Sequence, residues 1–200
     1  DGSWREEMAA FEKWLGRTEI VAIGECGIDL HWDTTYYKEQ RAVFERQLRV
    51  AGEMDLPVII HSRDSLPEIF DILKRQRRAM KGVLHCFPGT AEDAARAADL
   101  GFLLGIGGVV TFKRSGMAET VRQAGASRLV LETDCPYLAP APHRGKRNES
   151  GYIPLIAAKI AEILGEDIKK IAETTTNNAM KLFNLPCQNL SDKDIKQVAK

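Results

Sequence analysis

Apolar and polar residues follow two periods along this chain, and the two periods predict strands and helices in alternation. Five short apolar runs are typical of buried strands. They cover residues 20–24, 57–60, 82–84, 102–106 and 128–133. Because these runs are apolar on both faces, they favour a parallel sheet that is covered by helices.

Between the strands, apolar residues recur at helical spacing. Ser65 and Glu68 form the pattern of a capping box, with Pro67 in the first turn, and Thr90 with Asp93 repeats the pattern. The expected helices span residues 3–15, 36–54, 117–124, 152–164, 167–174 and 178–185, in addition to those that begin after Ser65 and Thr90. Residues 190–200 are expected to form a weak helix or a frayed tail.

Strand and helix alternate five times, which predicts βα crossovers of one hand and a parallel sheet. A closed (β/α)₈ barrel usually needs about 250 residues, and this chain has 200. We therefore predict an α/β fold of the TIM-barrel type that is incomplete, with about five parallel βα units. One domain is expected over residues 1–186, followed by a polar tail over residues 187–200.

Composition narrows the class of protein. Hydrophobic residues make up 44% and charged residues 28% of the chain, and the formal net charge is zero. A zero net charge argues against a strongly basic nucleic-acid scaffold, although a local basic patch can still hold a phosphodiester. No apolar run approaches the roughly 20 residues of a membrane span, and no signal peptide is evident. Four cysteines without a Cys-x-x-Cys pair predict a reducing, cytoplasmic location.

Four chemically active side chains stand at predicted strand ends: Glu25, His61, His85 and Asp134. Parallel-sheet folds place their chemistry at the carboxyl ends of strands. A single strand-end histidine is more often structural than a ligand, and an acid there can cap a helix or pair with an arginine. Two histidines and two carboxylates in equivalent positions instead favour a hydrolytic site for Zn²⁺, Mn²⁺ or Mg²⁺.

Three cysteines each follow one of these ligands by one residue: Cys26, Cys86 and Cys135. A Cys/His zinc cluster would use them, but neighbouring side chains on a strand point to opposite faces. We therefore expect small buried thiols that face the covering helices.

Basic residues gather in the loop of residues 142–149, which follows the Asp134 strand. Arg144, Lys146 and Arg147 could hold substrate phosphate there, together with Arg63 near His61. The competing interpretation is a solvated loop braced by Arg147 and Glu149. The basic run at residues 74–78 ends a helix and is expected to be surface.

Seven ordered motifs between about residues 3 and 185 together resemble the TatD family of metal-dependent deoxyribonucleases. The motifs are GECGID at residues 24–29, HSR at 61–63, HCFPG at 85–89, GGVVTFK at 107–113, ETDCPYLAP at 132–140, RGKRNE at 144–149 and TTNNAMKLF at 175–183.

The resemblance implies a TIM barrel of the amidohydrolase superfamily with a site for two divalent metal ions. It implies that Glu25 bridges the metals and that His61 and His85 bind one of them. Asp134 would bind the other ion and handle the proton of the attacking water. DNA is the substrate that the resemblance implies.

The chain departs from the family pattern at one place. The family also uses a His-x-His pair on its first strand, and no His-x-His is present here. The family's first three strands are therefore expected to be absent, so that the chain is truncated, is completed by a partner chain, or has lost part of its site.

Three functional hypotheses follow. The first is a metal-dependent phosphodiesterase, a deoxyribonuclease that uses metal-activated water. The second is an amide or ester hydrolase of the same superfamily. The third is a catalytically impaired chain that acts only in assembly or in nucleic-acid binding.

Overall fold

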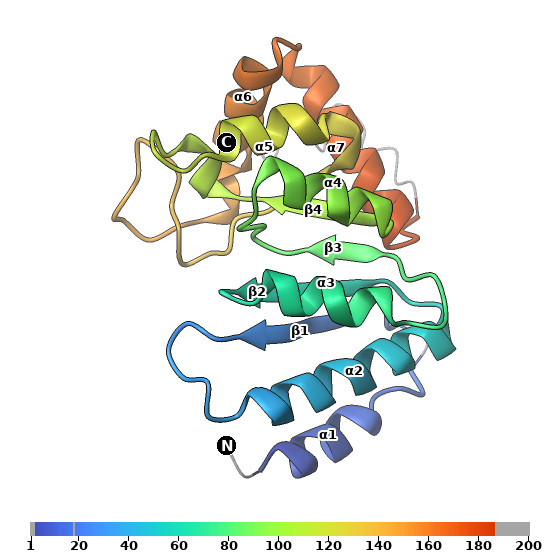
Figure 1. Ribbon diagram of the computed structural model, residues 1–200. Coiled ribbons are helices and arrows are strands. Elements are labelled where there is room, and N and C mark those ends of the chain that lie inside the picture. Colours follow the sequence, from blue (N-terminus) through green and yellow to red (C-terminus); the bar gives the residue numbers. More distant parts are fainter. Residues whose placement is uncertain (1–2, 18, 187–200) are drawn as a thin grey trace.

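The computed structural model describes residues 3–17 and 19–186. Its centre is one parallel sheet of five strands in the order β1-β2-β3-β4-β5 (Figure 1). The strands are β1 (Ile23–Asp29), β2 (Val58–Arg63), β3 (Gly82–Leu84), β4 (Phe102–Ile106) and β5 (Leu129–Leu131). Sequential order without reversal is the winding of a barrel segment rather than of a doubly wound sheet, so the predicted α/β class with βα crossovers is confirmed. The predicted absence of further strands stays a prediction.

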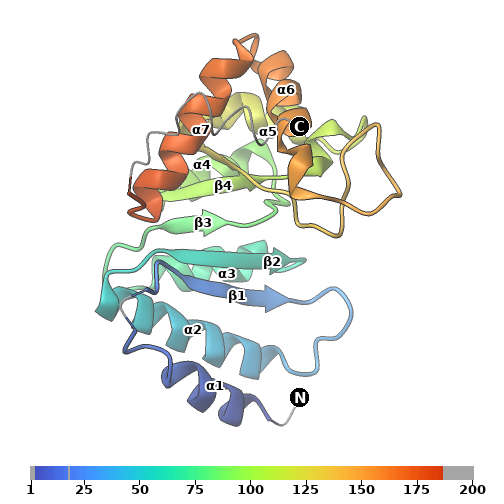
Figure 2. The ribbon, with the colours of Figure 1, turned by 180° about the vertical axis from the view of Figure 1, so that it is seen from behind.

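Helices connect the strands and flank the sheet (Figures 1 and 2). They are α1 (Trp4–Glu12), α2 (Tyr37–Met54), α3 (Leu66–Lys74), α4 (Ala91–Asp99), α5 (Met117–Ala124), α6 (Ile153–Leu164) and α7 (Ile168–Leu182), with short 3₁₀ turns η1 (Gly108–Thr111), η2 (Ala126–Arg128) and η3 (Ser150–Tyr152). In the described residues, no helix is long and apolar enough to cross a membrane.

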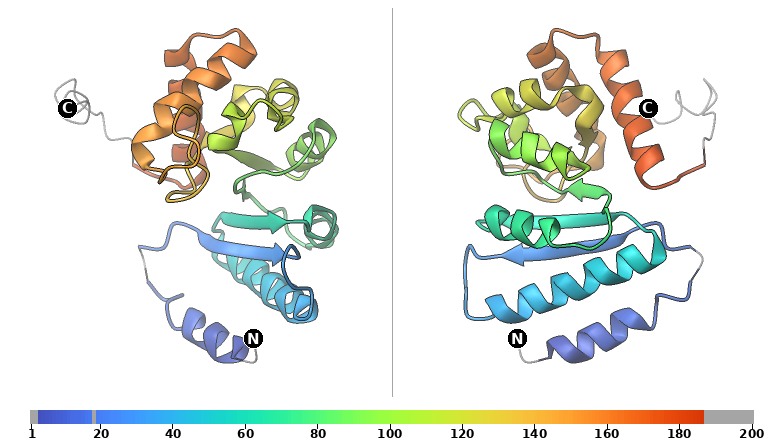
Figure 3. Two further views of the ribbon diagram at one scale, coloured as in Figure 1. Left: turned by 90° about the vertical axis from the view of Figure 1, so that its left-hand side faces the viewer. Right: turned by 45° about the vertical axis from the view of Figure 1, so that its right-hand side comes forward.

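Alternation along each strand separates two faces of the sheet. Ile60, Leu84 and Leu104 are fully buried in the hydrophobic core. Ile59 and His61 occupy the alternate positions of β2 and are only half-buried. Seen edge-on in Figure 3 (left), α2 and α3 lie together on one side of β1 and β2. The functional side chains therefore project from the face opposite these helices.

Two strands are longer at their carboxyl ends than the apolar runs predicted. Glu25 and His61 lie inside β1 and β2 rather than after them. The pairing continues because Gly24 and Gly27 let the two backbones approach. A Cβ atom on Gly27 would lie 1.9 Å from the carbonyl oxygen of His61. Glycine is thus required at the point where polar residues enter the sheet.

The predicted capping box at Ser65 is wrong, because the Ser65 side chain does not cap α3. Its buried hydroxyl instead donates to the carbonyl oxygen of Ile28 on the neighbouring strand. The capping box at Thr90 and Asp93 is confirmed.

The two helices predicted over residues 167–174 and 178–185 form the single helix α7. The polar residues at the predicted break do not end the helix. The Thr175 hydroxyl donates to the carbonyl of Ile171, and Asn178 donates to the carbonyls of Ala126 and Leu129. The weak helix or tail predicted over residues 190–200 lies outside the described residues.

Candidate metal centre at the strand ends

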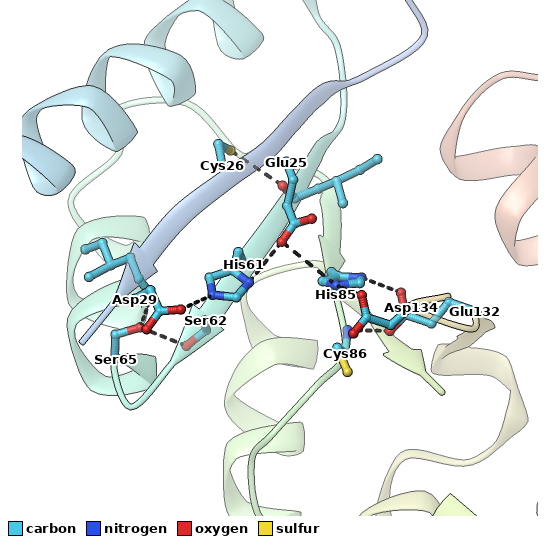
Figure 4. A network of polar contacts seen from close by, with 12 residues as sticks. Glu25, Cys26, Asp29, His61, Ser62, Ser65, His85, Cys86, Glu132 and Asp134 are labelled. Atoms are coloured by element: carbon cyan, nitrogen blue, oxygen red, sulfur yellow. Dashed lines mark hydrogen bonds and ion pairs between the residues drawn. The ribbon is translucent and has the colours of Figure 1, made fainter. Parts of the chain in front are cut away.

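The sheet brings all four predicted ligands to one edge (Figure 4). Oε1 of Glu25 lies 2.9 Å from Nδ1 of His61 and 3.9 Å from Nε2 of His85. Oδ1 of Asp134 lies 3.7 Å from the same Nε2. His85 thus stands between two carboxylates that come from opposite ends of the strand order.

Glu132 fixes the orientation of His85. Its Oε2 lies 2.6 Å from Nδ1 of His85, and its Oε1 accepts a hydrogen bond from the backbone N–H of Cys86. With Nδ1 occupied, Nε2 is the nitrogen that faces Glu25 and Asp134. A carboxylate that holds the remote ring nitrogen is the usual support of a metal-binding histidine.

Sequence reasoning treated Glu132 only as part of a strand end and gave it no role. Gly105 offered a sequence signal for this role, because it lies on β4, opposite Val130 of β5, and has no side chain. A Cβ atom there would lie 2.9–3.0 Å from the carboxylate of Glu132, so the glycine leaves room for it.

His61 also stands between two carboxylates. Its Nε2 lies 3.1 Å from Oδ2 of Asp29, and its Nδ1 faces Glu25. Gln40 on α2 fixes the backbone of Asp29, accepting from its N–H and donating to its carbonyl. Asp29 is therefore a second supporting acid that sequence reasoning did not single out.

The two halves of the site differ in exposure. The side chains of His85 and Glu132 are 15% and 19% exposed, whereas that of Glu25 is 49% exposed. The half built on β3 and β5 is therefore the more enclosed, and its charges are the less screened by water.

The electrostatics follow from these contacts. The hydrogen bond to Glu132 raises the pKa of His85. Burial opposes this increase, and the negative charges of Glu132, Glu25 and Asp134 add to it. Burial raises the pKa of Asp134, assisted by Glu132 and Glu25 and opposed by His85. For Asp29, the hydrogen bonds from the His31 backbone and from His61 outweigh burial and lower the pKa. Perturbed acids and bases of this kind gather at functional sites.

The backbone carries strain beside the site. Cys86 and Asp134 adopt left-handed conformations, with φ of 43° and 55°. Such conformations are uncommon for residues with a side chain, and they concentrate at functional sites.

In the part of the chain that the structure describes, no group of three or more His, Cys, Asp or Glu side chains is arranged so that it could hold a metal ion as it stands. The donor set is nevertheless of the right kind. Imidazole and carboxylate are ligands that Zn²⁺ and Mn²⁺ accept, and Nε2 of His85 is oriented toward two carboxylates by Glu132. The residues fit a divalent cation in chemistry, and binding would draw them closer together.

The cysteines take no part in this cluster. Cys26 is buried, and its thiol lies 3.6 Å from the carbonyl oxygen of Ile59. Burial raises the pKa of both Cys26 and Cys86 to about 12, and nearby acids add to the effect. The expectation of a buried thiol is wrong for Cys135, which is exposed because it begins the loop after β5. Cys187 lies outside the described residues.

Within the described residues, none of the predicted phosphate ligands forms an ion pair with the acids of the cluster. Arg63, at the end of β2, stands over the ring of exposed Trp32, 5.5 Å from its centroid. Arg144 lies 4.4 Å from the centroid of Phe112, and Lys146 and Arg147 are exposed. Among the described residues no salt bridge joins Arg147 to Glu149, so the bracing interaction considered for this loop is not formed.

Buried Asn148 organises the loop between β5 and η3. Its side chain donates to the carbonyls of Thr133 and Tyr137, and its backbone N–H donates to the carbonyl of Pro136. These bonds tie the end of the loop to its start, directly beside Asp134. Sequence reasoning quoted Asn148 within a motif but assigned it no role.

A sequentially ordered parallel sheet with acids and imidazoles at its carboxyl edge is the plan of barrel-type enzymes. The family model described as "TatD related DNase" matches residues 3–184. The chain belongs to this family, as its motifs predicted.

Relatives and solved structures agree. The chain is 43% identical over 187 residues to the uncharacterized metal-dependent hydrolase YabD of Bacillus subtilis, covering 92% of this chain and 71% of that protein. It is 39% identical to the 3'-5' ssDNA/RNA exonuclease TatD of Cronobacter sakazakii, covering 90% and 72%. The structure of YJJV, a TatD homolog from Escherichia coli K12, superimposes with a TM-score of 0.81 at 32% identity, covering 93% and 71%.

A more remote structure agrees in fold alone. An uncharacterized amidohydrolase from Saccharomyces cerevisiae has a TM-score of 0.74 at 19% identity. The chain spans only part of its relatives, for example 71% of the length of the Bacillus subtilis protein and 64% of that of a Buchnera aphidicola metal-dependent hydrolase.

Proposed function

We propose that this chain is a metal-dependent hydrolase of phosphodiester bonds, specifically a TatD-type deoxyribonuclease that uses water as its nucleophile. The observation that carries the proposal is the orientation of His85. Glu132 holds Nδ1, so that Nε2 faces the carboxylates of Glu25 and Asp134. Membership of the family and the names of the relatives support the same reading.

Each acid and imidazole has a role in the proposal. Glu25, His61, His85 and Asp134 would hold divalent cations. We propose two such ions, the number that the family resemblance implies. Such cations, whether Mg²⁺, Mn²⁺ or Zn²⁺, stabilise charge on phosphate oxygens and lower the pKa of water. Asp134 would take the proton of the attacking water.

Basic side chains around the site would hold the substrate. Four exposed basic residues at its margin are proposed for this role: Arg63, Arg144, Lys146 and Arg147. The arginine guanidinium can bind phosphate through two hydrogen bonds, and the lysine ammonium binds it as a compact charge. DNA is the proposed partner, and the relatives named as ssDNA/RNA exonucleases suggest single strands. The three described cysteines are free, in accord with the reducing, cytoplasmic location that we also propose.

Cleavage of labelled single-stranded DNA in the presence of Mg²⁺ or Mn²⁺ tests the function. We expect products that require the metal and that fall at least about 100-fold in Asp134→Ala, because base catalysis contributes about 10²–10⁴. Asp99→Ala removes an exposed acid at the end of α4 and should cleave like the unmodified chain. Equal cleavage by the two variants would reject the site, and hydrolysis of amide or ester substrates alone would favour the second hypothesis.

A further inference from the structure

A groove of about 700 Å³ lies between the segment that links η1 to α5 and the loop that follows β5. The two segments are 30 residues apart in sequence, and they lie side by side in Figures 1 and 2. The groove is lined in part by Thr111, Phe112, Lys113, Arg114, Ala141 and Arg144.

The groove and the adjacent loop are strongly basic. Three exposed cations line the groove, Lys113, Arg114 and Arg144, and two more, Lys146 and Arg147, follow in the same loop. None of the five forms a salt bridge within the described residues. In a chain of zero net charge, five uncompensated cations on two neighbouring segments produce a local positive field.

The groove is held in shape by specific contacts. The Thr111 hydroxyl accepts from the backbone N–H of Ala141 at 2.8 Å and donates to the carbonyl of Gly108 at 2.7 Å. A Cβ atom on Gly108 would lie 2.2 Å from the carbonyl oxygen of Leu138, so the two segments touch through their backbones. The groove therefore exists before any ligand arrives, which lowers the entropic cost of binding.

The groove lies next to a pocket that reaches the residue after His85. It shares Val109 and Ser115 with a smaller apolar pocket of about 260 Å³ that reaches Cys86 and Gly107. Cys86 follows His85 directly, and its backbone N–H donates to Glu132. A single strand of nucleic acid that leaves the site across the ends of β4 and β5 would thus meet the groove.

We infer that this groove binds the phosphate backbone of a nucleic-acid single strand at nucleotides remote from the bond that is cleaved. The inference rests on the proposed function and adds Lys113 and Arg114 to the phosphate contacts. It predicts that Lys113 and Arg114 contribute to the salt dependence of the affinity for single-stranded DNA, because each phosphate contact releases condensed counterions.

Binding of a fluorescein-labelled oligothymidine, followed by anisotropy in EDTA, tests the inference without catalysis. The double variant Lys113→Ala/Arg114→Ala should bind about tenfold more weakly near 0.1 M salt. The slope of log K against log salt should become shallower by about 1.4, since each single-strand contact contributes about 0.7.

A matched control removes the same charges elsewhere. Lys74→Ala/Arg77→Ala alters two exposed cations at the end of α3, at the opposite end of the sheet, and should leave affinity and slope unchanged. Equal loss in both double variants, an unchanged slope in the groove variant, or equally effective competition by polyglutamate would overturn the inference.

The inference and the proposed function fail separately. Hydrolysis of bis(p-nitrophenyl) phosphate by the unmodified chain with Mn²⁺ tests the site on a substrate too small to reach the groove. Binding in EDTA tests the groove alone. If the unmodified chain hydrolyses this substrate but the groove variant binds DNA normally, the proposed function stands and the inference about the groove is rejected.

Discussion

At the scale of single residues, the site depends on which acid holds which imidazole. Glu132 supports His85, and Asp29 supports His61. Both supporting acids lie on the same strand or strand end as a predicted ligand, with Glu132 two residues before Asp134 and Asp29 four residues after Glu25. The strand ends thus supply both the acids proposed to bind metal and the acids that orient the histidines.

Replacing Glu132 with glutamine tests this division. The amide keeps the shape of the side chain but loses the negative acceptor at Nδ1 of His85. We expect metal affinity and activity to fall about 10- to 100-fold, as for other residues that support metal ligands. The pKa of His85 should fall in the metal-free protein, because the hydrogen bond to Glu132 is the largest cause of its elevation.

Isothermal titration with Mn²⁺ and an NMR pH titration of the histidines measure these effects. Glu173→Gln makes the same change on an exposed position of α7 and should alter neither quantity. An unchanged His85 pKa in the Glu132 variant would show that another group holds the ring.

At the scale of elements, apolar periodicity predicted most of the fold and failed where polar side chains satisfy backbone groups. The strands were correctly located because Ile60, Leu84 and Leu104 must be buried. The strand ends were misplaced because Glu25 and His61 are polar, and pairing there depends on glycines whose role only the neighbouring backbone reveals.

Helix α7 shows the same limit. Threonine and asparagine have low helix propensity, so the sequence between residues 174 and 178 predicted a break. Asn178 instead donates two hydrogen bonds to the carbonyls of Ala126 and Leu129, at 3.0 and 2.8 Å. Contacts between residues about 50 apart cannot be read from local pattern, and they override propensity here.

Truncation of Asn178 to alanine should lower the free energy of unfolding by about 1–3 kcal/mol, because two backbone acceptors beside β5 lose their donor. The neighbouring Asn177→Ala changes an exposed residue and should cost less than about 0.5 kcal/mol. Urea unfolding followed by circular dichroism compares the two variants. Similar midpoints would mean that the two hydrogen bonds do not hold α7 against the sheet.

At the scale of the whole molecule, the candidate site takes residues from both the first and the last strand of the sheet. Glu25 comes from β1, His61 from β2, His85 from the end of β3, and Asp134 from beyond β5. Sequence spacing predicted that these four would converge, since parallel strands end at one edge. It could not predict the supporting acids, the burial of Asn148 or the groove, because each depends on contacts between distant segments.

A cation bound at this edge would link strands that otherwise interact only through their neighbours. We expect Mn²⁺ to raise the midpoint of thermal unfolding, with about 2.7 kcal/mol of stabilisation at 100 times the dissociation constant. EDTA should reverse the shift. His85→Ala should remove the Mn²⁺-dependent shift, whereas His143→Ala, which alters a ring stacked on Tyr152, should retain it. A shift retained in His85→Ala would place the cation elsewhere.

The closure of the loop after β5 by Asn148 has a consequence for how relatives of this protein can diverge. One buried side chain joins residues 133 and 137 to residue 148, so the base of the loop is set independently of the residues at its tip. We expect insertions, deletions and exchanges between residues 138 and 148 to leave Asp134 in place. The tip is therefore a natural point for transplanting segments between homologues to alter substrate preference while the hydrolytic apparatus is conserved.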